Sequence, residues 1–186
     1  EAATLALACG FFFCLMSGYY ILRPMRDAMG IAGGVRNLHW LFAGTLALMI
    51  LANPIFAWLV SRLPRKQFIP VVYRFFLLNL ALFFAALHLL PEDQASWVAR
   101  GFYLWVSVFN LFVVSIFWGF MADLFRSQDA KRLFGLIGIG GTLGAMAGSG
   151  ITALFSVLLG PINLIPISML LLEGAARCAI ALSRRD

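Results

Sequence analysis

Charged residues are scarce in this chain of 186 residues, in which Asp, Glu, Lys and Arg together make up only 12%. Soluble domains carry about 25% charged residues, so this chain has too few charges to cover a water-facing surface. Hydrophobic residues make up 62% of the chain, and its mean hydropathy is +0.93. These values exclude a sizeable soluble catalytic domain. Because a helix needs about 20 apolar residues to cross a bilayer, the length accommodates roughly six spans with short connections.

Cysteine and histidine are also rare. The three cysteines, Cys9, Cys14 and Cys178, lie in apolar runs and form no Cys-x-x-Cys pair, and the two histidines, His39 and His88, lie in different runs. This pattern fits neither a disulfide framework nor a metal site. It also leaves the Gly-Ser-Gly segment at 148–150 without a nearby histidine base, and no phosphate-loop or zinc-protease motif is present. We therefore expect no enzyme, no catalytic residue, no metal and no cofactor.

Six apolar runs of helical length follow one another, without the short alternating segments that are typical of membrane barrels. They cover residues 4–22, 38–63, 68–90, 97–125, 133–159 and 162–182. Polar or glycine-rich segments separate the runs, and Pro54 predicts a kink in the second. We predict an all-α fold, a polytopic six-helix transmembrane bundle, in which residues 1–186 form a single transmembrane domain.

The net charge of +6 comes from basic residues scattered between the apolar runs, not from a basic block interleaved with aromatic residues. We therefore expect the lipid bilayer as a partner, and no nucleic acid polymer. Basic residues gather after the second, fourth and sixth runs: Arg62, Arg65, Lys66, Arg126, Lys131, Arg132, Arg184 and Arg185. The positive-inside rule then predicts that both termini are cytoplasmic. Arg23, Arg26 and Arg36 depart from this rule, because they fall on the outer side.

Two of the exceptional arginines belong to a candidate binding site. Tyr19, Arg23, Arg26 and Asp27 share one face of a helix, provided that the helix continues past Pro24. Charges at membrane depth are costly and usually face a water-filled cavity or a partner. We therefore predict that these four residues bind an anionic solute. The alternative is that both arginines snorkel to lipid headgroups at a helix end.

A second polar row occurs in the third and fourth runs. Arg74 lies in the third, and Arg100, Tyr103, Ser107 and Asn110 follow one another at steps of three or four residues in the fourth. Such a row lines a polar path through an apolar bundle, so Arg74 and Asn110 are further candidate solute-binding residues. The alternatives are that Arg100 is an interfacial anchor and that Asn110 makes only a hydrogen bond between helices.

Glycines in the fifth run predict close helix packing. Gly140, Gly144 and Gly148 form two overlapping Gly-x-x-x-Gly steps, which let another helix approach closely. In the sixth run, Glu173 and Arg177 are four residues apart in the favourable order for an ion pair. We expect these two charges to neutralise each other and not to contact solute.

The layout of six helices with basic links resembles one half of a major facilitator transporter. That superfamily has a conserved pattern in the link between its second and third helices, and Leu59, Arg62, Arg65 and Lys66 match it, with Ser61 where the pattern has Asp. The resemblance implies a second six-helix half, with the solute bound between the halves. With the usual acid missing, we expect Asp123 to pair with Arg62 in a charge cluster that latches the cytoplasmic side of the cavity.

Two segments narrow the resemblance to ATP/ADP translocase-like nucleotide exchangers. The segment at 20–27 is similar to their Leu-Arg-x-x-Lys-Asp motif, with Arg26 in place of the substrate-linked Lys, and the segment at 117–125 also resembles that family. This implies an inner-membrane secondary transporter in a bacterium that moves an anionic solute such as a nucleotide by exchange. Two alternatives stay open: a carrier of another small organic solute or drug, and a membrane sensor or assembly module that transports nothing.

Overall fold

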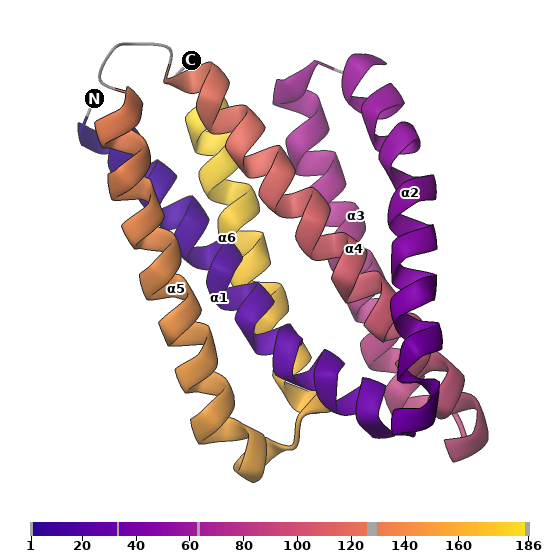
Figure 1. Cartoon of the computed structure of the whole chain (residues 1–186). Helices are drawn as coiled ribbons and strands as arrows, with labels where there is room; N and C mark the ends of the chain where they lie inside the picture. The colour runs from indigo at the N-terminus through magenta and orange to yellow at the C-terminus, as the bar shows by residue number, and fades with distance from the viewer. Residues whose placement is uncertain (1, 33, 63, 126–129, 185–186) are drawn as a thin grey trace.

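The computed structural model describes residues 2–32, 34–62, 64–125 and 130–184, without the side chains of residues 65–67, 130 and 131. Over these residues the chain forms long helices and two short 3-10 turns (Figure 1). The elements are α1 (Ala2–Ala32), η1 (Val35–Asn37), α2 (Leu38–Arg62), α3 (Arg65–Leu89), α4 (Glu92–Leu124), α5 (Ala130–Leu159), η2 (Ile162–Leu164) and α6 (Ile165–Ser183). Among the described residues, six helices are long and apolar enough to cross a membrane. The predicted all-α, six-helix membrane bundle is confirmed.

Several helices extend beyond the apolar runs that predicted them. α1 continues through Pro24 and ends at Ala32, so the polar segment after residue 22 belongs to the helix. α4 begins at Glu92, after Pro91, because an acidic first turn is favourable at a helix N-terminus. At the junction after α1, Gly34 has a φ of 93°, which glycine adopts readily. The helical content is therefore greater than the length of the apolar runs indicates.

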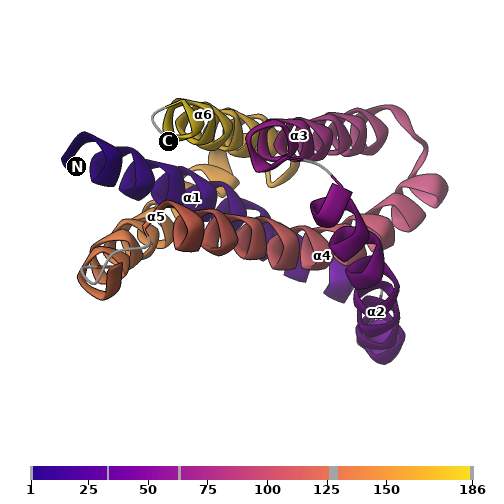
Figure 2. The same cartoon turned by 90° about the horizontal axis from the view of Figure 1, so that it is seen from above.

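α1 lies at the centre of the bundle and packs against α4, α5 and α6. Seen from above (Figure 2), α6 and α3 lie along one side, α1 and α4 lie next to them, and α5 and α2 flank this pair on the other side. α1 begins and α6 ends at the same end of the bundle in Figure 1, as an even number of spans requires. This arrangement brings the C-terminal half of α1 beside the N-terminal half of α4.

Aromatic side chains fill the contact between α1 and α4. Phe12 stacks on Phe117 with ring centroids 4.3 Å apart, and it meets Trp118 edge-on at 5.2 Å. Phe11 also packs edge-on against Phe117, at 4.9 Å. These rings keep the two central helices in a defined relative position, because aromatic pairs add geometric preference to the burial of apolar surface.

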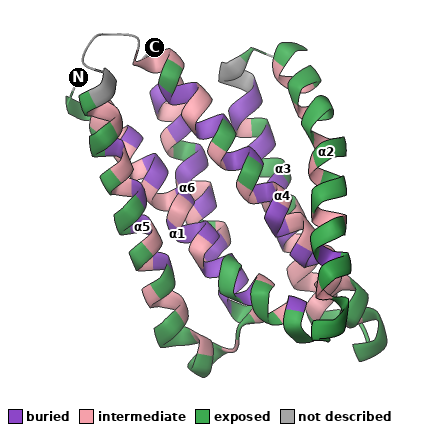
Figure 3. Ribbon diagram, in the orientation of Figure 1, coloured by how far each residue is buried: buried purple, intermediate pink, exposed green. Residues whose placement is uncertain are grey.

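α2 is the least buried helix of the bundle. It is described in full, and Leu41 is its one buried residue; Figure 3 shows exposed residues along most of its length. Large apolar side chains such as Trp40, Phe42 and Leu46 are more than half exposed. Such a surface is unfavourable in water, so the outer face of α2 is suited to lipid or to another apolar helix.

Candidate functional site: an arginine between α1 and α4

Close packing of α5 positions α1. Gly140, Gly144 and Gly148 all face α1, and a Cβ atom added at Gly140 would lie 2.8 Å from the carbonyl oxygen of Cys9. At Gly144 and Gly148, an added Cβ would collide with the carbonyl oxygens of Phe13 and Ser17. Real side chains do not fit there, so glycine is required along this stripe, and the two backbones approach directly.

Hydrogen bonds between helices hold α1 against both α5 and α6. The buried hydroxyl of Ser17 donates to the carbonyl oxygen of Gly144 at 2.9 Å, and the buried hydroxyl of Ser168 on α6 donates to the carbonyl oxygen of Gly18 at 2.8 Å. Both bonds lie in the middle of α1. The C-terminal half of α1, which carries Arg23, Arg26 and Asp27, lies beyond these bonds and contacts α4.

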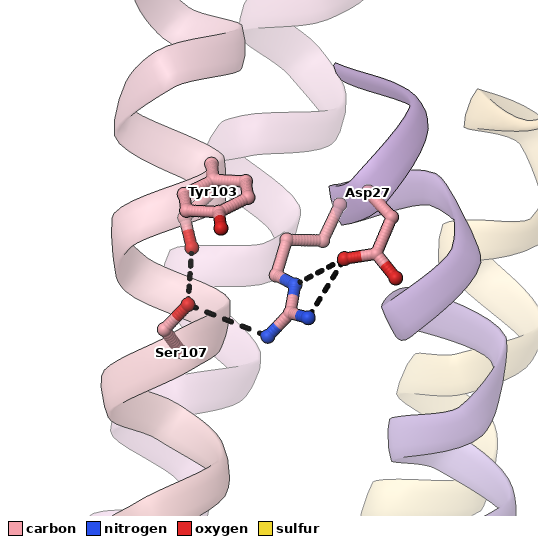
Figure 4. Close-up of polar contacts among 4 residues, drawn as sticks. Asp27, Tyr103 and Ser107 are labelled. Carbon is pink, nitrogen blue, oxygen red and sulfur yellow. Dashed lines mark hydrogen bonds and ion pairs between the residues drawn. The ribbon is translucent and has the colours of Figure 1, made fainter. Parts of the chain in front are cut away.

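Arg26 connects that half of α1 to α4. Its side chain is 19% exposed, and its Nε and Nη2 donate to the Oδ1 atom of Asp27 at 2.9 and 2.7 Å. Its Nη1 donates to the hydroxyl of Ser107 at 3.4 Å, and its guanidinium carbon lies 5.4 Å from the centre of the Tyr103 ring. The Ser107 hydroxyl in turn donates to the carbonyl oxygen of Tyr103 at 2.9 Å (Figure 4). A charge-assisted pair and a cation–π contact thus fix the guanidinium between two helices.

A glycine makes room for this arrangement. Gly30 is buried, and a Cβ atom added there would lie 2.9 Å from the ring of Tyr103. Gly30 lies beyond the first apolar run, yet it belongs to α1 and forms the surface on which Tyr103 rests. Tyr103 and Ser107 were foreseen only as members of a polar row on the fourth helix. Their helical spacing was the signal, and the crossing of α1 and α4 joins that row to Arg26.

The other predicted residues of α1 differ in exposure. Arg23 is exposed, and its guanidinium carbon lies 5.5 Å from the centre of the Tyr20 ring. Tyr19 is buried and meets the Tyr20 ring edge-on at 5.4 Å. Asp27 is exposed to 49% beside Arg26. The two guanidinium groups therefore differ in their surroundings. That of Arg26 is held by contacts with α4, and that of Arg23 is exposed.

Arg74 and Asn110 do not join this cluster. Arg74 is exposed on α3 and Asn110 is half-buried on α4, and among the described residues the hydrogen bonds of Arg26 go to Asp27 and Ser107. Arg100 lies over the ring of Trp97, 4.6 Å from its centre. That contact is typical of an interfacial anchor, which was the alternative for Arg100. A role of Arg74 or Asn110 in solute binding stays a prediction.

The predicted latch concerns the basic end of the bundle. Arg62 at the end of α2 lies over Trp58, 5.3 Å from the ring centre. Asp123 lies in the last turn of α4, and no salt bridge joins it to Arg62 among the described side chains. The side chains of Arg65, Lys66 and Lys131 lie outside the described part of the structure. The latch between Arg62 and Asp123 stays a prediction.

Two further features lie away from Arg26. The predicted pair on α6 is present, with 3.1 Å between Nε of Arg177 and Oε1 of Glu173. An apolar pocket of about 180 Å³ lies between α2, α3 and α4, at the end where α2 joins α3. It is lined by Phe56, Val60, Phe68, Ile69, Ser115, Ile116, Gly119 and Phe120.

Within the described residues, no group of three or more His, Cys, Asp or Glu side chains could hold a metal ion.

The chemistry available at Arg26 is anion binding. A guanidinium presents several donors in a planar fork that matches carboxylate and phosphate oxygens. Neighbouring Arg23 adds a second permanent positive charge within one turn of the same helix. The hydroxyl of Ser107 and the ring of Tyr103 orient the guanidinium.

Comparison with known proteins points to a transporter family. Residues 95–163 match the family model described as TLC ATP/ADP transporter. The matched segment is less than half of the chain; it contains Tyr103, Ser107 and the three glycines of α5, and it does not reach Arg26. It supports the resemblance to ATP/ADP translocase-like proteins, whereas the wider resemblance to the major facilitator superfamily stays a prediction. Neither the search of curated proteins nor the search of solved structures found a match.

Proposed function

We propose that this chain is the amino-terminal half of a secondary transporter and that it binds a nucleotide of the ATP or ADP type through Arg26 and Arg23. The observation that carries the proposal is the partly buried guanidinium of Arg26, held by partners on two helices of a membrane-spanning bundle. The match of residues 95–163 to ATP/ADP transporters supports the choice of a nucleotide.

The environment of Arg26 favours solute binding over snorkelling. A snorkelling arginine needs only a long stem and access to headgroups. Arg26 instead reaches the hydroxyl of Ser107 and the ring of Tyr103 on α4, which costs side-chain freedom and surrounds the charge with protein. Charges in such positions of membrane proteins usually serve a solute or ion pathway.

Arg23 and Arg26 would share the phosphate groups of one solute. They lie three residues apart, within one turn of α1, and the exposed guanidinium of Arg23 is free of ion pairs to the described acidic side chains. One phosphate at Arg26 and a second near Arg23 would suit a nucleoside diphosphate or triphosphate better than a neutral solute. Tyr19 would support the site by packing, because it is buried.

The remaining parts of the proposal concern the whole carrier. A second six-helix half would complete the solute cavity on the side where α2 and α5 flank α1 and α4, and rocking of the halves would expose the site alternately. Both termini would be cytoplasmic in a bacterial inner membrane, as the distribution of basic residues favours. Transport would be by exchange of one nucleotide for another.

Uptake of labelled ADP and ATP by the full-length protein tests the proposal. We expect Arg26→Ala and Arg23→Ala to abolish uptake, and Arg23→Lys to weaken it, because an ammonium cannot make the bidentate contact of a guanidinium. Arg36→Ala is the matched control, since Arg36 is an exposed arginine in η1, just beyond the end of α1. Wild-type uptake by the Arg23→Ala, Arg26→Ala double variant would contradict the proposal. Uptake of other organic anions but not of nucleotides would show that the solute is an organic anion other than a nucleotide.

A further inference from the structure

The guanidinium of Arg26 is already occupied by an anion that belongs to the protein. Its Nε and Nη2 both donate to a single carboxylate oxygen, Oδ1 of Asp27, at 2.9 and 2.7 Å. This edge of a guanidinium is one of those that receive carboxylate or phosphate oxygens in bidentate recognition. In the conformation observed, Asp27 therefore stands where an oxygen of an anionic solute would bind.

The contact between these two residues is not an ordinary helix-stabilising pair. Arg26 and Asp27 are consecutive in α1, and neighbours in sequence do not face each other on a helix. The pair forms because Ser107 and Tyr103 hold the guanidinium on the α4 side, and the carboxylate turns toward it. The partner that can move is thus Asp27, which is exposed to 49%, whereas Arg26 is exposed to 19%.

Asp27 can leave Arg26 at the least electrostatic cost when another anion takes its place. Its side chain is 49% exposed, so protein does not enclose it and it has room to leave the guanidinium. Arg26 would then be an unpaired charge at membrane depth, which is unfavourable unless another anion replaces the carboxylate. The exchange of one anion for another keeps the charge of Arg26 compensated throughout.

We propose that Asp27 is a built-in counter-anion of the solute site: it occupies Arg26 when the site is empty, and the phosphate of the solute must displace it. This inference rests on the proposed function and adds the regulation of the same site. A site that is open for only a fraction of the time binds its ligand with an apparent affinity lowered by that fraction. Asp27 thereby sets the anion concentration that the site needs before it fills.

Modification of Arg26 by phenylglyoxal, a reagent for arginine, tests this inference on the full-length protein in detergent, with peptide mass spectrometry reading the product at Arg26. We expect Asp27→Asn to raise the modification rate several-fold, because the Nε and Nη2 edge becomes accessible. We also expect the ADP concentration that half-protects Arg26 to fall by about tenfold, the change that follows if Asp27 occupies the guanidinium about nine-tenths of the time.

Asp93→Asn is the matched control, because it removes the same charge from an exposed residue in the first turn of α4 without touching the partners of Arg26. An equal effect of both variants would overturn the inference. The loss of a negative charge anywhere nearby, and not the loss of the contact with Arg26, would then explain the change. Unchanged half-protection in Asp27→Asn would also overturn it. If neither ADP nor ATP protects Arg26 in any variant while Asp27→Asn still raises the modification rate, the proposed function fails and the role of Asp27 as counter-anion stands.

Discussion

The hydroxyl of Ser17 donates a hydrogen bond of 2.9 Å to the carbonyl oxygen of Gly144, so α1 and α5 lie close enough for a short side chain to reach the backbone of the other helix. One turn on, Gly148 lies so close to the carbonyl oxygen of Ser17 that a side chain does not fit there. The helix that carries Arg26 is thus positioned by residues more than two turns away from the charge.

Gly144→Leu should disrupt this contact. A side chain at this position meets the carbonyl oxygen of Phe13, and overpacking of this kind costs about 1–3 kcal/mol. We expect the thermal midpoint in detergent to fall by several degrees and transport to be impaired. Gly138→Leu is the control, because an added Cβ there meets nothing within 4 Å. Equal midpoints for the two variants would show that the close approach contributes nothing.

Ser17→Ala and Ser168→Ala should each have a small effect. Each variant removes one buried hydrogen bond between helices, a contribution that averages about 0.6 kcal/mol in membrane proteins. We expect the two losses in thermal stability to add, because the bonds join α1 to different helices. Thr142→Ala removes a bond within α5 and provides the baseline. A loss above about 2 kcal/mol from either serine would mean that its hydroxyl does more than join helices.

The pair of Glu173 and Arg177 should tolerate exchange of its charges. The two side chains form an ion pair 3.1 Å apart on one face of α6, and their predicted role is mutual neutralisation. We expect Arg177→Glu alone to lower the amount of folded protein, and the double variant Glu173→Arg, Arg177→Glu to restore it with normal uptake. Normal folding but absent uptake in the double variant would indicate that one of these charges contacts solute.

Cysteine labelling tests the predicted orientation. α3 begins and α4 begins at opposite ends of the bundle in Figure 1, so residues 66 and 92 should lie on opposite sides of the membrane. We expect Lys66→Cys to react only from the cytoplasm and Glu92→Cys only from outside, in a background in which Cys9, Cys14 and Cys178 are replaced by Ala. Reaction of both positions from the same side would refute this topology.

The number and type of helices follow from the sequence, because the bilayer thickness and the scarcity of charge leave few other solutions. The ends of the helices follow less well. The charges of Arg23, Arg26 and Asp27 suggested the end of a membrane span, yet α1 continues to Ala32. Once a helix is anchored by its neighbours, hydrogen bonds within its backbone outweigh the local cost of Pro24 and of a few polar side chains.

The sequence by itself determined that Arg26 and Asp27 lie on one helix and that Tyr103 and Ser107 lie on another, since helical periodicity follows from local spacing. Only the tertiary structure decided that these two pairs meet. The crossing of α1 and α4 depends on the fit of Gly30 to the Tyr103 ring and on the packing of Phe12 against Phe117, residues far apart along the chain. Arg74, which the sequence made an equal candidate, lies exposed on α3, and its position relative to Arg26 depends on how the helices pack, which no spacing within one helix encodes.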